Sequence, residues 1–354
     1  MNGSGMLNRI RTYLTGRHRT PKLSVVIVFY RMPRQALNTL YTLSTDFQQH
    51  VSADDYEIIA VENRSDANID NEALKQIRGP IRYFLRDENL PTPVHAVNFG
   101  VAQARGEQLC LMVDGARMVT PGLVHHLLLA NRLYDSAVVS VPGYHLGDEL
   151  QQKAVLNGYN EEQEQQLLAS VNWRDDGYRL LDIACLSGTS RSGFFRPLGE
   201  SNSLGITRQM FDQLGGFDTG FTESGGGQCN LDFYKRALEL EKSRHVFLPG
   251  EGSFHQYHGG ATTSGSEERD AMMQRHFDQY HALRGEYYSP AQKEPVYLGA
   301  LHPSVMRFVH HSAKRRRAME GELIENYSEQ AAKRVMHPKR FPDVPPEESL
   351  PREC

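Results

Sequence analysis

The stretch VNFGVAQARGEQLCLMVDGA, residues 97–116, changes its hydrophobic spacing at Gly106. Before that glycine the apolar residues recur at the spacing of one helix face, whereas residues 108–114 are almost continuously apolar. A strand of this composition is typical of a parallel sheet that is covered on both faces. The stretch therefore predicts a helix that ends before Gly106 and a buried strand that ends on Asp114.

The same alternation continues along the chain. Further strands are expected at residues 23–30, 56–63, 81–86, 137–141 and 245–250. Helices are expected to begin at Pro33 and at Pro93, to run from a cap at Thr120 through Tyr134, and to occupy residues 208–214 and 230–243. This order predicts an α/β fold with a mainly parallel central sheet flanked by helices.

Composition limits the classes of protein to consider. The 354 residues are 39% hydrophobic and 23% charged, as in an ordinary globular protein, and the formal net charge of -4 argues against nucleic acid as a partner. Four cysteines without a C-x-x-C pair predict reduced thiols and no cysteine metal site. No apolar run reaches the ~18 residues of a membrane span. We therefore expect a cytoplasmic protein.

Polar residues stand at the carboxyl ends of three expected strands. Glu62 and Asn63 end one strand, Asp87 follows the next, and Asp114 ends another. Open parallel sheets bind ligands at this edge, so we expect these residues to line one crevice. The sequence has neither the G-x-G-x-x-G of a dinucleotide site after its first strand nor a P-loop. The crevice must therefore be built from side chains.

Four segments carry a family resemblance. In chain order they are LSVVIVFYRMPRQALNTLYTL, YEIIAVENRSD, VNFGVAQARGEQLCLMVDGA and GGFDTGF. Over residues 22–260, the chain resembles the GT-A fold glycosyltransferases of family 2. The resemblance implies an inverting transfer of a sugar from a nucleotide diphosphate donor, most commonly a UDP-sugar, to a hydroxyl of a glycan or lipid-linked acceptor. Such enzymes usually serve polysaccharide or glycan biosynthesis.

The resemblance also implies where the donor nucleotide binds. Glu62 stands where the family has an acid that contacts the base, and a carboxylate can accept the imide N–H of uracil. Alternatively, Glu62 is a solvated loop acid. Asn98 matches the family's N-x-G helix, where an asparagine can also serve packing alone. The residues implied to bind the donor are Tyr30, Arg31, Glu62, Asn63, Asn98 and Asp114.

A divalent metal, Mn²⁺ or Mg²⁺, is implied by the same comparison. Asp114 falls on the first acid of the family's Asp-x-Asp motif, but Ala116 replaces the second. His255 and His258 follow an expected strand, and a histidine in this region completes the metal site of many GT-A enzymes. Each histidine can instead be a packed or exposed loop residue. The glycines after His258 favour it, because they let the backbone approach a ligand.

The motif does not show which residue acts as the general base. Family members usually carry it in a Glu-Asp pair at the start of the helix after GGFD, where this chain has Cys229 and Asn230. The remaining candidates are Asp232, which is favoured, Glu223 and Glu200. Asp232 could instead stabilise the first turn of its own helix, by ~0.3–1 kcal/mol. Cations that could offset the charge of the leaving diphosphate are Arg117, Arg191 and Arg196.

The expected organisation has four parts. A basic segment at 1–21 precedes the GT-A domain at 22–260, in which the polar region of about 144–205 is interpreted as an acceptor-side insertion. A charged helical extension follows at 261–340, and a disordered tail at 341–354. The basic clusters near both ends suggest peripheral contact with an anionic membrane surface at the inner face of the membrane.

Two other functions stay open at this point. The missing Glu-Asp pair and the reduced Asp-x-Asp motif are compatible with a relative that binds sugar nucleotides but has lost catalysis. A sugar nucleotidyltransferase on a similar fold is the third candidate. Its glycine-rich loop of the G-x-G-T-R type is absent after the first strand.

Overall fold

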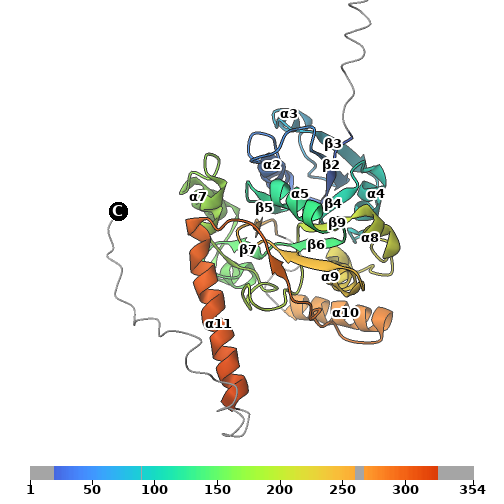
Figure 1. Cartoon of the computed structure of the whole chain (residues 1–354). Coiled ribbons are helices and arrows are strands. Elements are labelled where there is room, and N and C mark those ends of the chain that lie inside the picture. The colour runs from blue at the N-terminus through green and yellow to red at the C-terminus, as the bar shows by residue number, and fades with distance from the viewer. Residues whose placement is uncertain (1–19, 89, 260–266, 326–354) are drawn as a thin grey trace, which may run out of the picture.

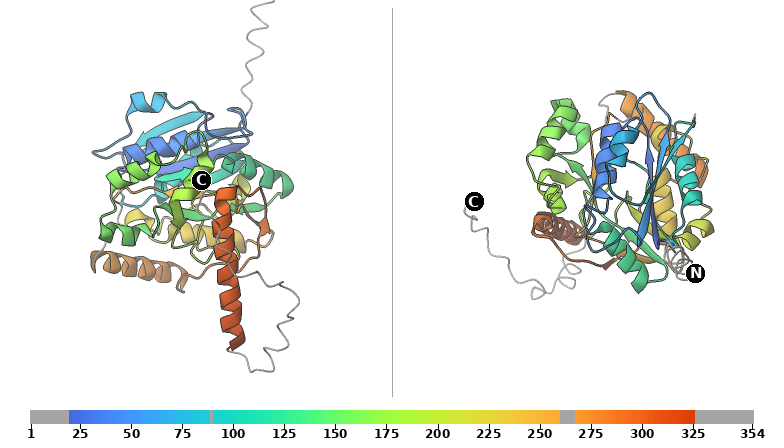
Figure 2. Two further views of the ribbon diagram at one scale, coloured as in Figure 1. Left: turned by 90° about the vertical axis from the view of Figure 1, so that its left-hand side faces the viewer. Right: turned by 90° about the horizontal axis from the view of Figure 1, so that it is seen from above.

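A computed structural model describes residues 20–88, 90–259 and 267–325 (Figure 1). The predicted tail at 341–354 and almost all of the predicted basic segment at 1–21 lie outside these ranges. Within them the chain forms two sheets, with helices packed on both faces of the larger one (Figure 2).

The larger sheet contains every strand that the sequence predicts. All its neighbouring pairs are parallel except the two that β9 makes with β4 and β6. In spatial order its strands are β12 (Val296–Tyr297), β10 (Arg244–Phe247), β6 (Ala137–Ser140), β9 (Leu204–Thr207), β4 (Gln108–Met112), β1 (Leu23–Phe29), β2 (Tyr56–Asn63) and β3 (Ile81–Arg86).

The smaller sheet consists of strands of three or four residues, which the sequence analysis missed. In spatial order they are β5 (Arg117–Val119), β11 (Ser253–His255), β7 (Gly143–Leu146) and β8 (Ala184–Leu186). Such strands are too short to show a hydrophobic period. This sheet begins directly after Asp114 and contains His255, so it decides how these two residues meet.

The helices follow the predicted order in the first half of the chain. The α-helices are α2 (Pro33–Thr42), α3 (Asn71–Lys75), α4 (Val94–Gln103), α5 (Leu123–Leu133), α6 (Gln151–Ala154), α7 (Glu161–Ala169), α8 (Arg208–Gln213), α9 (Cys229–Glu239), α10 (Glu267–Arg284) and α11 (Met306–Glu325). The 3₁₀ turns are η1 (Val155–Asn157), η2 (Gly177–Ile183), η3 (Ser224–Gly226) and η4 (Pro303–Val305).

The first strand shows why the larger sheet is covered on both faces. All seven residues of β1 are buried, and they alternate between two apolar cores. Val26 and Val28 pack in the core that contains residues of α4, α8 and α9, whereas Val25 and Ile27 pack in the core that contains residues of α2 and α5. Because successive side chains of a strand point to opposite faces, an uninterrupted apolar run requires apolar layers on both sides.

One local expectation was wrong. The helix predicted from Thr120 begins at Leu123, with Gly122 at its N-cap. The hydroxyl of Thr120 instead donates to the buried carboxylate of Glu251. The polar region of about 144–205 is built into both sheets, because it supplies most of β7, all of β8 and the first residues of β9.

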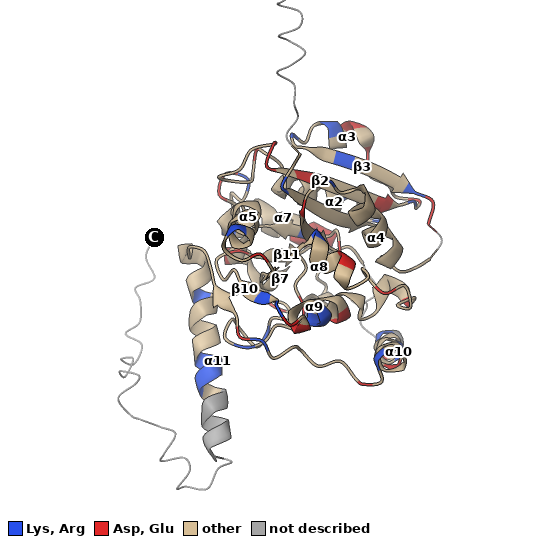
Figure 3. Cartoon of the chain, turned by 45° about the vertical axis from the view of Figure 1, so that its right-hand side comes forward, with Lys and Arg blue, Asp and Glu red and all other residues tan. Residues whose placement is uncertain are grey.

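Of the helical extension predicted at 261–340, the structure describes residues 267–325, which form α10, β12, η4 and α11. α11 projects from the body of the protein in Figure 1 and in the left view of Figure 2, and the ribbon of its middle is coloured for Lys and Arg in Figure 3. Among the described residues, no helix is both long and apolar enough to cross a membrane.

Gly100 provides a test of how α4 packs on the sheet. A Cβ at this position would lie 2.5 Å from Cγ1 of Val26 and 3.1 Å from Cγ2 of Val61. We predict that Gly100→Ala lowers the free energy of unfolding by about 1–2 kcal/mol, because overpacking of stiff valines outweighs the gain in helix propensity. Urea titration measures the change. Gly188→Ala is the control, since nothing lies within 4 Å of its Cβ position; equal stability losses would contradict the prediction.

A buried histidine gives a pH prediction. The Nδ1 atom of His126 lies 3.0 Å from the carboxylate of Glu251. Burial alone would lower the pKa of His126, but this hydrogen bond and the charge of Glu251 raise it above 6.5. A raised pKa stabilises the fold fully below the unfolded value of about 6.5 and loses that contribution as pH rises through the folded value.

We therefore expect wild type to lose more stability than His126→Gln between pH 6 and pH 9. Denaturant unfolding at a series of pH values measures the difference. Parallel pH profiles for the two proteins would contradict it.

Candidate active site

A cavity of about 820 Å³ opens at the carboxyl ends of β1, β2 and β4. It contains six of the residues that the sequence analysis selected for the donor or the metal. These six are Tyr30, Arg31, Asn63, Asp114, His255 and His258. The cavity wall also contains Ser224, Gly225, Gly227 and His276.

Three ligand-type side chains meet inside this cavity. The carboxylate of Asp114 and the ring nitrogens of His255 and His258 lie within 4.8 Å of one another. The Nε2 atom of His255 is 3.2 Å from Oδ2 of Asp114. Arg117 donates from Nε to the same oxygen at 3.0 Å, and Ala116 donates its backbone N–H to the other oxygen at 3.1 Å.

Strand pairing creates this cluster. Antiparallel pairing of β5 with β11 places Arg117, three residues after Asp114 in the chain, opposite His255. The backbone N–H of Gln256 continues the pairing by donating to the carbonyl of Ala116 at 2.8 Å. Two segments about 140 residues apart are thus held in register, and their side chains reach the same point.

Burial and charge favour the protonation states that bind a cation. Burial raises the pKa of Asp114, but His255 and Arg117 more than offset this and hold that pKa well below its usual range. Burial lowers the pKa of His255 to about 4 and also lowers that of His258. One carboxylate and two neutral imidazoles are a ligand set that suits Mn²⁺.

Ala116 explains why a second acid is absent from the motif. Its side chain is fully buried in the apolar core under α2 and α5. A carboxylate in that core would have to lose its hydration without gaining a partner. Among the described residues, His255 of β11 and His258 of the following loop are the side chains that cluster with Asp114.

Tyr30, which is 50% exposed, and Arg31 also line the cavity. The backbone of Arg31 has a φ of +54°, a conformation that is uncommon for a residue with a side chain. Its guanidinium makes two hydrogen bonds of 2.7 Å to Asp66. Asn63 also lines the cavity, and its buried Oδ1 atom has no hydrogen-bond partner.

The predicted placement of Glu62 in the crevice was wrong. Its side chain is fully buried and is not part of the cavity wall. The carboxylate accepts from the backbone N–H of Ile69, at 3.1 and 3.2 Å, and from the hydroxyl of Tyr83 at 2.5 Å. Glu62 therefore holds the loop after β2. Asp87 also lies outside the cavity, as an exposed residue paired with Arg64.

Asn98 does not reach the cavity either. Its amide donates to the carbonyl of Phe217 at 2.9 Å and accepts from the N–H of the same residue at 3.0 Å. Both ends of the amide are thus occupied in joining α4 to the turn after α8. This contact and the close packing of Gly100 give the N-x-G pattern a structural role.

Asp232, the favoured general base, is placed as a structural residue. It is 1% exposed and is absent from the cavity wall. Arg236 donates to it at 2.8 Å, and Arg284 donates to both of its oxygens at 2.6 and 2.9 Å. Both carboxylate oxygens of Asp232 are therefore occupied by arginine donors.

The other two carboxylates differ in position. Glu223 directly precedes Ser224 and Gly225 of the cavity wall, and its carboxylate lies 3.4 Å from Arg275. Glu200 accepts from Thr189 at 3.3 Å and from the amide of Asn230 at 2.7 Å. Of the three arginines expected near the leaving group, Arg117 contacts Asp114, whereas Arg191 and Arg196 do not line the cavity.

Three functional candidates were missed by the sequence analysis. His276 of α10 lines the cavity, and its Nε2 atom is buried without a partner. Gln151 of α6 contacts His255, and His145 of β7 lies beside it, with ring centroids 5.4 Å apart. The sequence held no signal for these residues, because they belong to elements whose position depends on tertiary packing.

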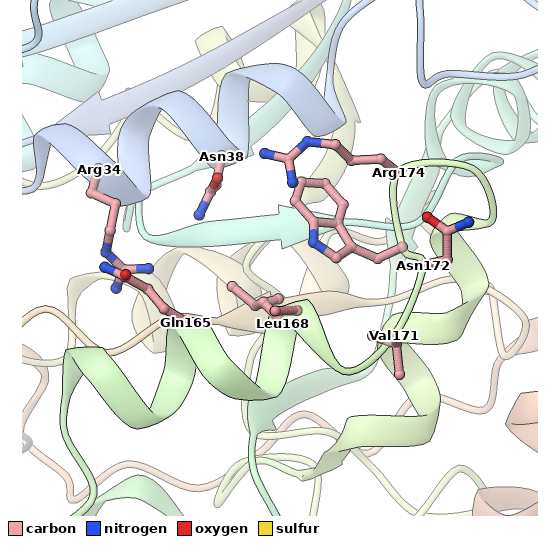
Figure 4. A pocket seen from close by; sticks show the side chains of 9 residues that line it. Arg34, Asn38, Gln165, Leu168, Val171, Asn172 and Arg174 are labelled. Atoms are coloured by element: carbon pink, nitrogen blue, oxygen red, sulfur yellow. The ribbon is translucent and has the colours of Figure 1, made fainter.

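A second cavity, of about 310 Å³, lies between α2 and α7. Arg34 and Asn38 point into it from α2, and Gln165 and Leu168 from α7 (Figure 4). Arg34 also donates to the backbone carbonyl of Tyr257 at 3.2 Å. This cavity therefore adjoins the segment that carries the two histidines.

Comparison with known proteins identifies the domain. Residues 24–186 match the family described as Glycosyl transferase family 2. The chain carries a family-2 glycosyltransferase domain. The α/β architecture, with its mostly parallel central sheet, is the GT-A fold that the sequence analysis expected. No curated protein matches the sequence.

Solved structures resemble the glycosyltransferase domain at low sequence identity. S. aureus TarS has a TM-score of 0.45 and 12% identity, over 88% of this chain and 44% of the TarS chain. Residues 1–349 of TarS in complex with UDP-GlcNAc have a TM-score of 0.45 and 11% identity, over 87% of this chain and 77% of the other. This chain thus spans less than half of the full TarS chain.

The two roles considered for Asp232 are tested by Asp232→Asn. We expect this change to lower the free energy of unfolding by about 2–3 kcal/mol, because it removes the charged partner of Arg236 and leaves Arg284 with Asp218 alone. Binding of a nucleotide should stay within about threefold of wild type, since Asp232 does not line the cavity. Urea unfolding and calorimetric titration with UDP measure the two effects. Full stability with lost turnover would restore Asp232 as the base.

Proposed function

We propose that this glycosyltransferase moves a sugar, with inversion at the anomeric carbon, from a UDP-sugar to a hydroxyl acceptor. The observation that carries the proposal is the Asp114, His255 and His258 cluster, which shares one cavity with Tyr30 and Asn63. A diphosphate at the cluster would leave the nucleotide near Tyr30 and the sugar toward Gly225. The cavity volume of about 820 Å³ is in the range of small-molecule sites.

The nucleotide base is assigned to the end of the cavity that contains Tyr30. The half-exposed ring of Tyr30 offers a face for stacking, and Arg31 extends the same edge. Asn63 takes the role that the sequence analysis gave to Glu62, because its unpartnered Oδ1 is an acceptor for an imide N–H. This assignment favours uracil as the base.

Asp114, His255 and His258 would hold a divalent cation, Mn²⁺ or Mg²⁺. When bound, the cation would offset the negative charge of the donor's diphosphate. Arg117 adds a fixed positive charge beside Asp114. This arrangement replaces the second acid of the Asp-x-Asp motif with imidazole ligands.

Glu223 is the proposed general base. It adjoins the wall formed by Ser224 and Gly225, and it is partly exposed. In the inverting step the acceptor oxygen bonds to the anomeric carbon while its proton passes to Glu223. The bond to the diphosphate breaks at the same time, and its electron pair leaves with the nucleotide.

The acceptor is proposed to be a glycan or a lipid-linked sugar in polysaccharide or glycan biosynthesis. For a membrane-bound acceptor, the exposed side chains of Lys314, Arg315 and Arg317 on α11 offer a contact with anionic lipid headgroups. Flotation with anionic vesicles at low salt tests this contact, and a protein that stays at the bottom of the gradient would exclude it.

A relative that binds donors without catalysis remains the second candidate. It is favoured by Ala116, by Cys229 and Asn230 in place of the acid pair, and by the two arginine partners of Asp232. Turnover separates the two functions, because a nonfunctional relative would bind UDP without releasing it from any UDP-sugar.

The metal assignment is tested with a panel of UDP-sugars in the presence of Mn²⁺, Mg²⁺ or EDTA. We expect wild type to release UDP with Mn²⁺, and Asp114→Asn to lower kcat/KM at least 100-fold, because one ligand and its charge are lost. Asp54→Asn, a change at an exposed residue, is the matched control.

UDP release that is equal in EDTA would exclude the metal. Pyrophosphate release from a nucleoside triphosphate would instead indicate a nucleotidyltransferase.

The base assignment is tested by comparing two matched amide variants. Glu223→Gln should lower kcat by about 10²–10⁴ with little change in KM for the donor, because it removes only the proton acceptor. Glu200→Gln should stay within about tenfold of wild type. Steady-state kinetics at saturating acceptor distinguish the two, and the reverse order of effects would assign the base to Glu200.

A further inference from the structure

Gln151 makes three hydrogen bonds to two neighbouring histidines, His255 and His145, and its side chain is fully buried. Its amide Nε2 donates to the backbone carbonyl of His255 at 3.0 Å. Its amide Oε1 lies 2.5 Å from Nδ1 of the same histidine. Its backbone N–H donates to Nδ1 of His145 at 2.9 Å.

The first of these bonds fixes the orientation of the amide. The carbonyl of His255 can only accept, so it must face the NH₂ group of Gln151. The amide oxygen then faces Nδ1 of His255, and an amide oxygen can only accept as well. Nδ1 of His255 must therefore carry a proton, whether the ring is neutral or charged.

This proton decides which atom of His255 faces the carboxylate. With Nδ1–H directed at Gln151, the neutral ring has its lone pair on Nε2, which lies 3.2 Å from Oδ2 of Asp114. Two lone pairs at this distance repel each other unless a cation lies between them. The arrangement is therefore suited to a metal ion shared by His255 and Asp114.

Gln151 favours the other tautomer in His145. Its Nδ1 accepts from the backbone N–H of Gln151, so the neutral ring carries its proton on Nε2. A protonated nitrogen cannot bind a metal, which explains how His145 can lie beside His255 without belonging to the ligand cluster.

We propose that Gln151 is a positioning residue that sets the tautomer of His255 and so prepares Nε2 as a metal ligand. This inference rests on the metal site of the proposed function and adds a residue from the polar region, beyond the motifs of the family. Partners of this kind orient the ligand ring, and their loss typically lowers metal affinity by about 10–100-fold.

The first test is Mn²⁺ affinity of the full chain, measured by electron paramagnetic resonance of free Mn²⁺. Gln151→Leu should raise the Kd for Mn²⁺ by about 10–100-fold. Gln151→Glu keeps an acceptor for Nδ1–H but loses the donor to the carbonyl of His255, so its Kd should lie between those of wild type and Gln151→Leu. Equal affinity of wild type and Gln151→Leu would overturn the proposal.

The second test needs no metal and no turnover. Two-bond ¹H–¹⁵N NMR spectra of the metal-free protein at neutral pH report which ring nitrogen carries the proton. Wild type and Gln151→Glu should show His255 protonated at Nδ1, and a neutral Nε2–H tautomer in wild type would overturn the proposal. This measurement decides the question even if Gln151→Leu does not fold.

The outcomes separate this inference from the proposed function. A wild type that binds no Mn²⁺ contradicts the metal site, and with it any role of Gln151 toward a metal. A wild type that binds Mn²⁺ and loses nothing in Gln151→Leu overturns the role of Gln151 alone.

Discussion

The candidate site depends on the antiparallel pairing of β5 with β11. This pairing joins the end of β4, where Asp114 stands, to the segment that carries His255 and His258. The side chain of Gln256 reinforces it by donating to the carbonyl of Gln35 at 3.0 Å and to the hydroxyl of Thr39 at 3.1 Å. α2 is thereby tied to the same point. A register shift of one residue would turn the ligands away from each other, because side chains alternate between faces.

The departures from the family motif have a common physical cause. Where the second acid is expected, Ala116 is buried under α2, and the side chains that cluster with Asp114 are His255 of β11 and His258 of the following loop. Where the acid pair is expected, Cys229 and Asn230 are buried at the start of α9, and Asp232 is occupied by two arginines. Positions that a motif assigns to chemistry are here used for packing. The chemistry therefore has to rest on neighbouring side chains.

The site shows what residue patterns can and cannot reveal. Tyr30, Asn63 and Asp114 were predictable, because each stands at or just beyond the end of a strand and all parallel strands of a sheet end at the same edge. Glu62 precedes Asn63 by one residue, and adjacent strand residues face opposite sides, so only one of them could reach the cavity. The motif does not show which of the two side chains faces the cavity. The buried hydrogen bonds of Glu62 to Ile69 and Tyr83 show that Glu62 is turned away from it.

The sequence by itself determined the layered fold and its family. Continuous apolar runs between residues that begin or end helices are local patterns. They predict the strands correctly, because a strand buried on both faces needs apolar residues at nearly every position. Only the tertiary structure decided the partners of each functional group. The contacts of Gln151 with His255 and of Arg284 with Asp232 span 104 and 52 residues. Such contacts have no local pattern, because they arise when packing brings distant segments together.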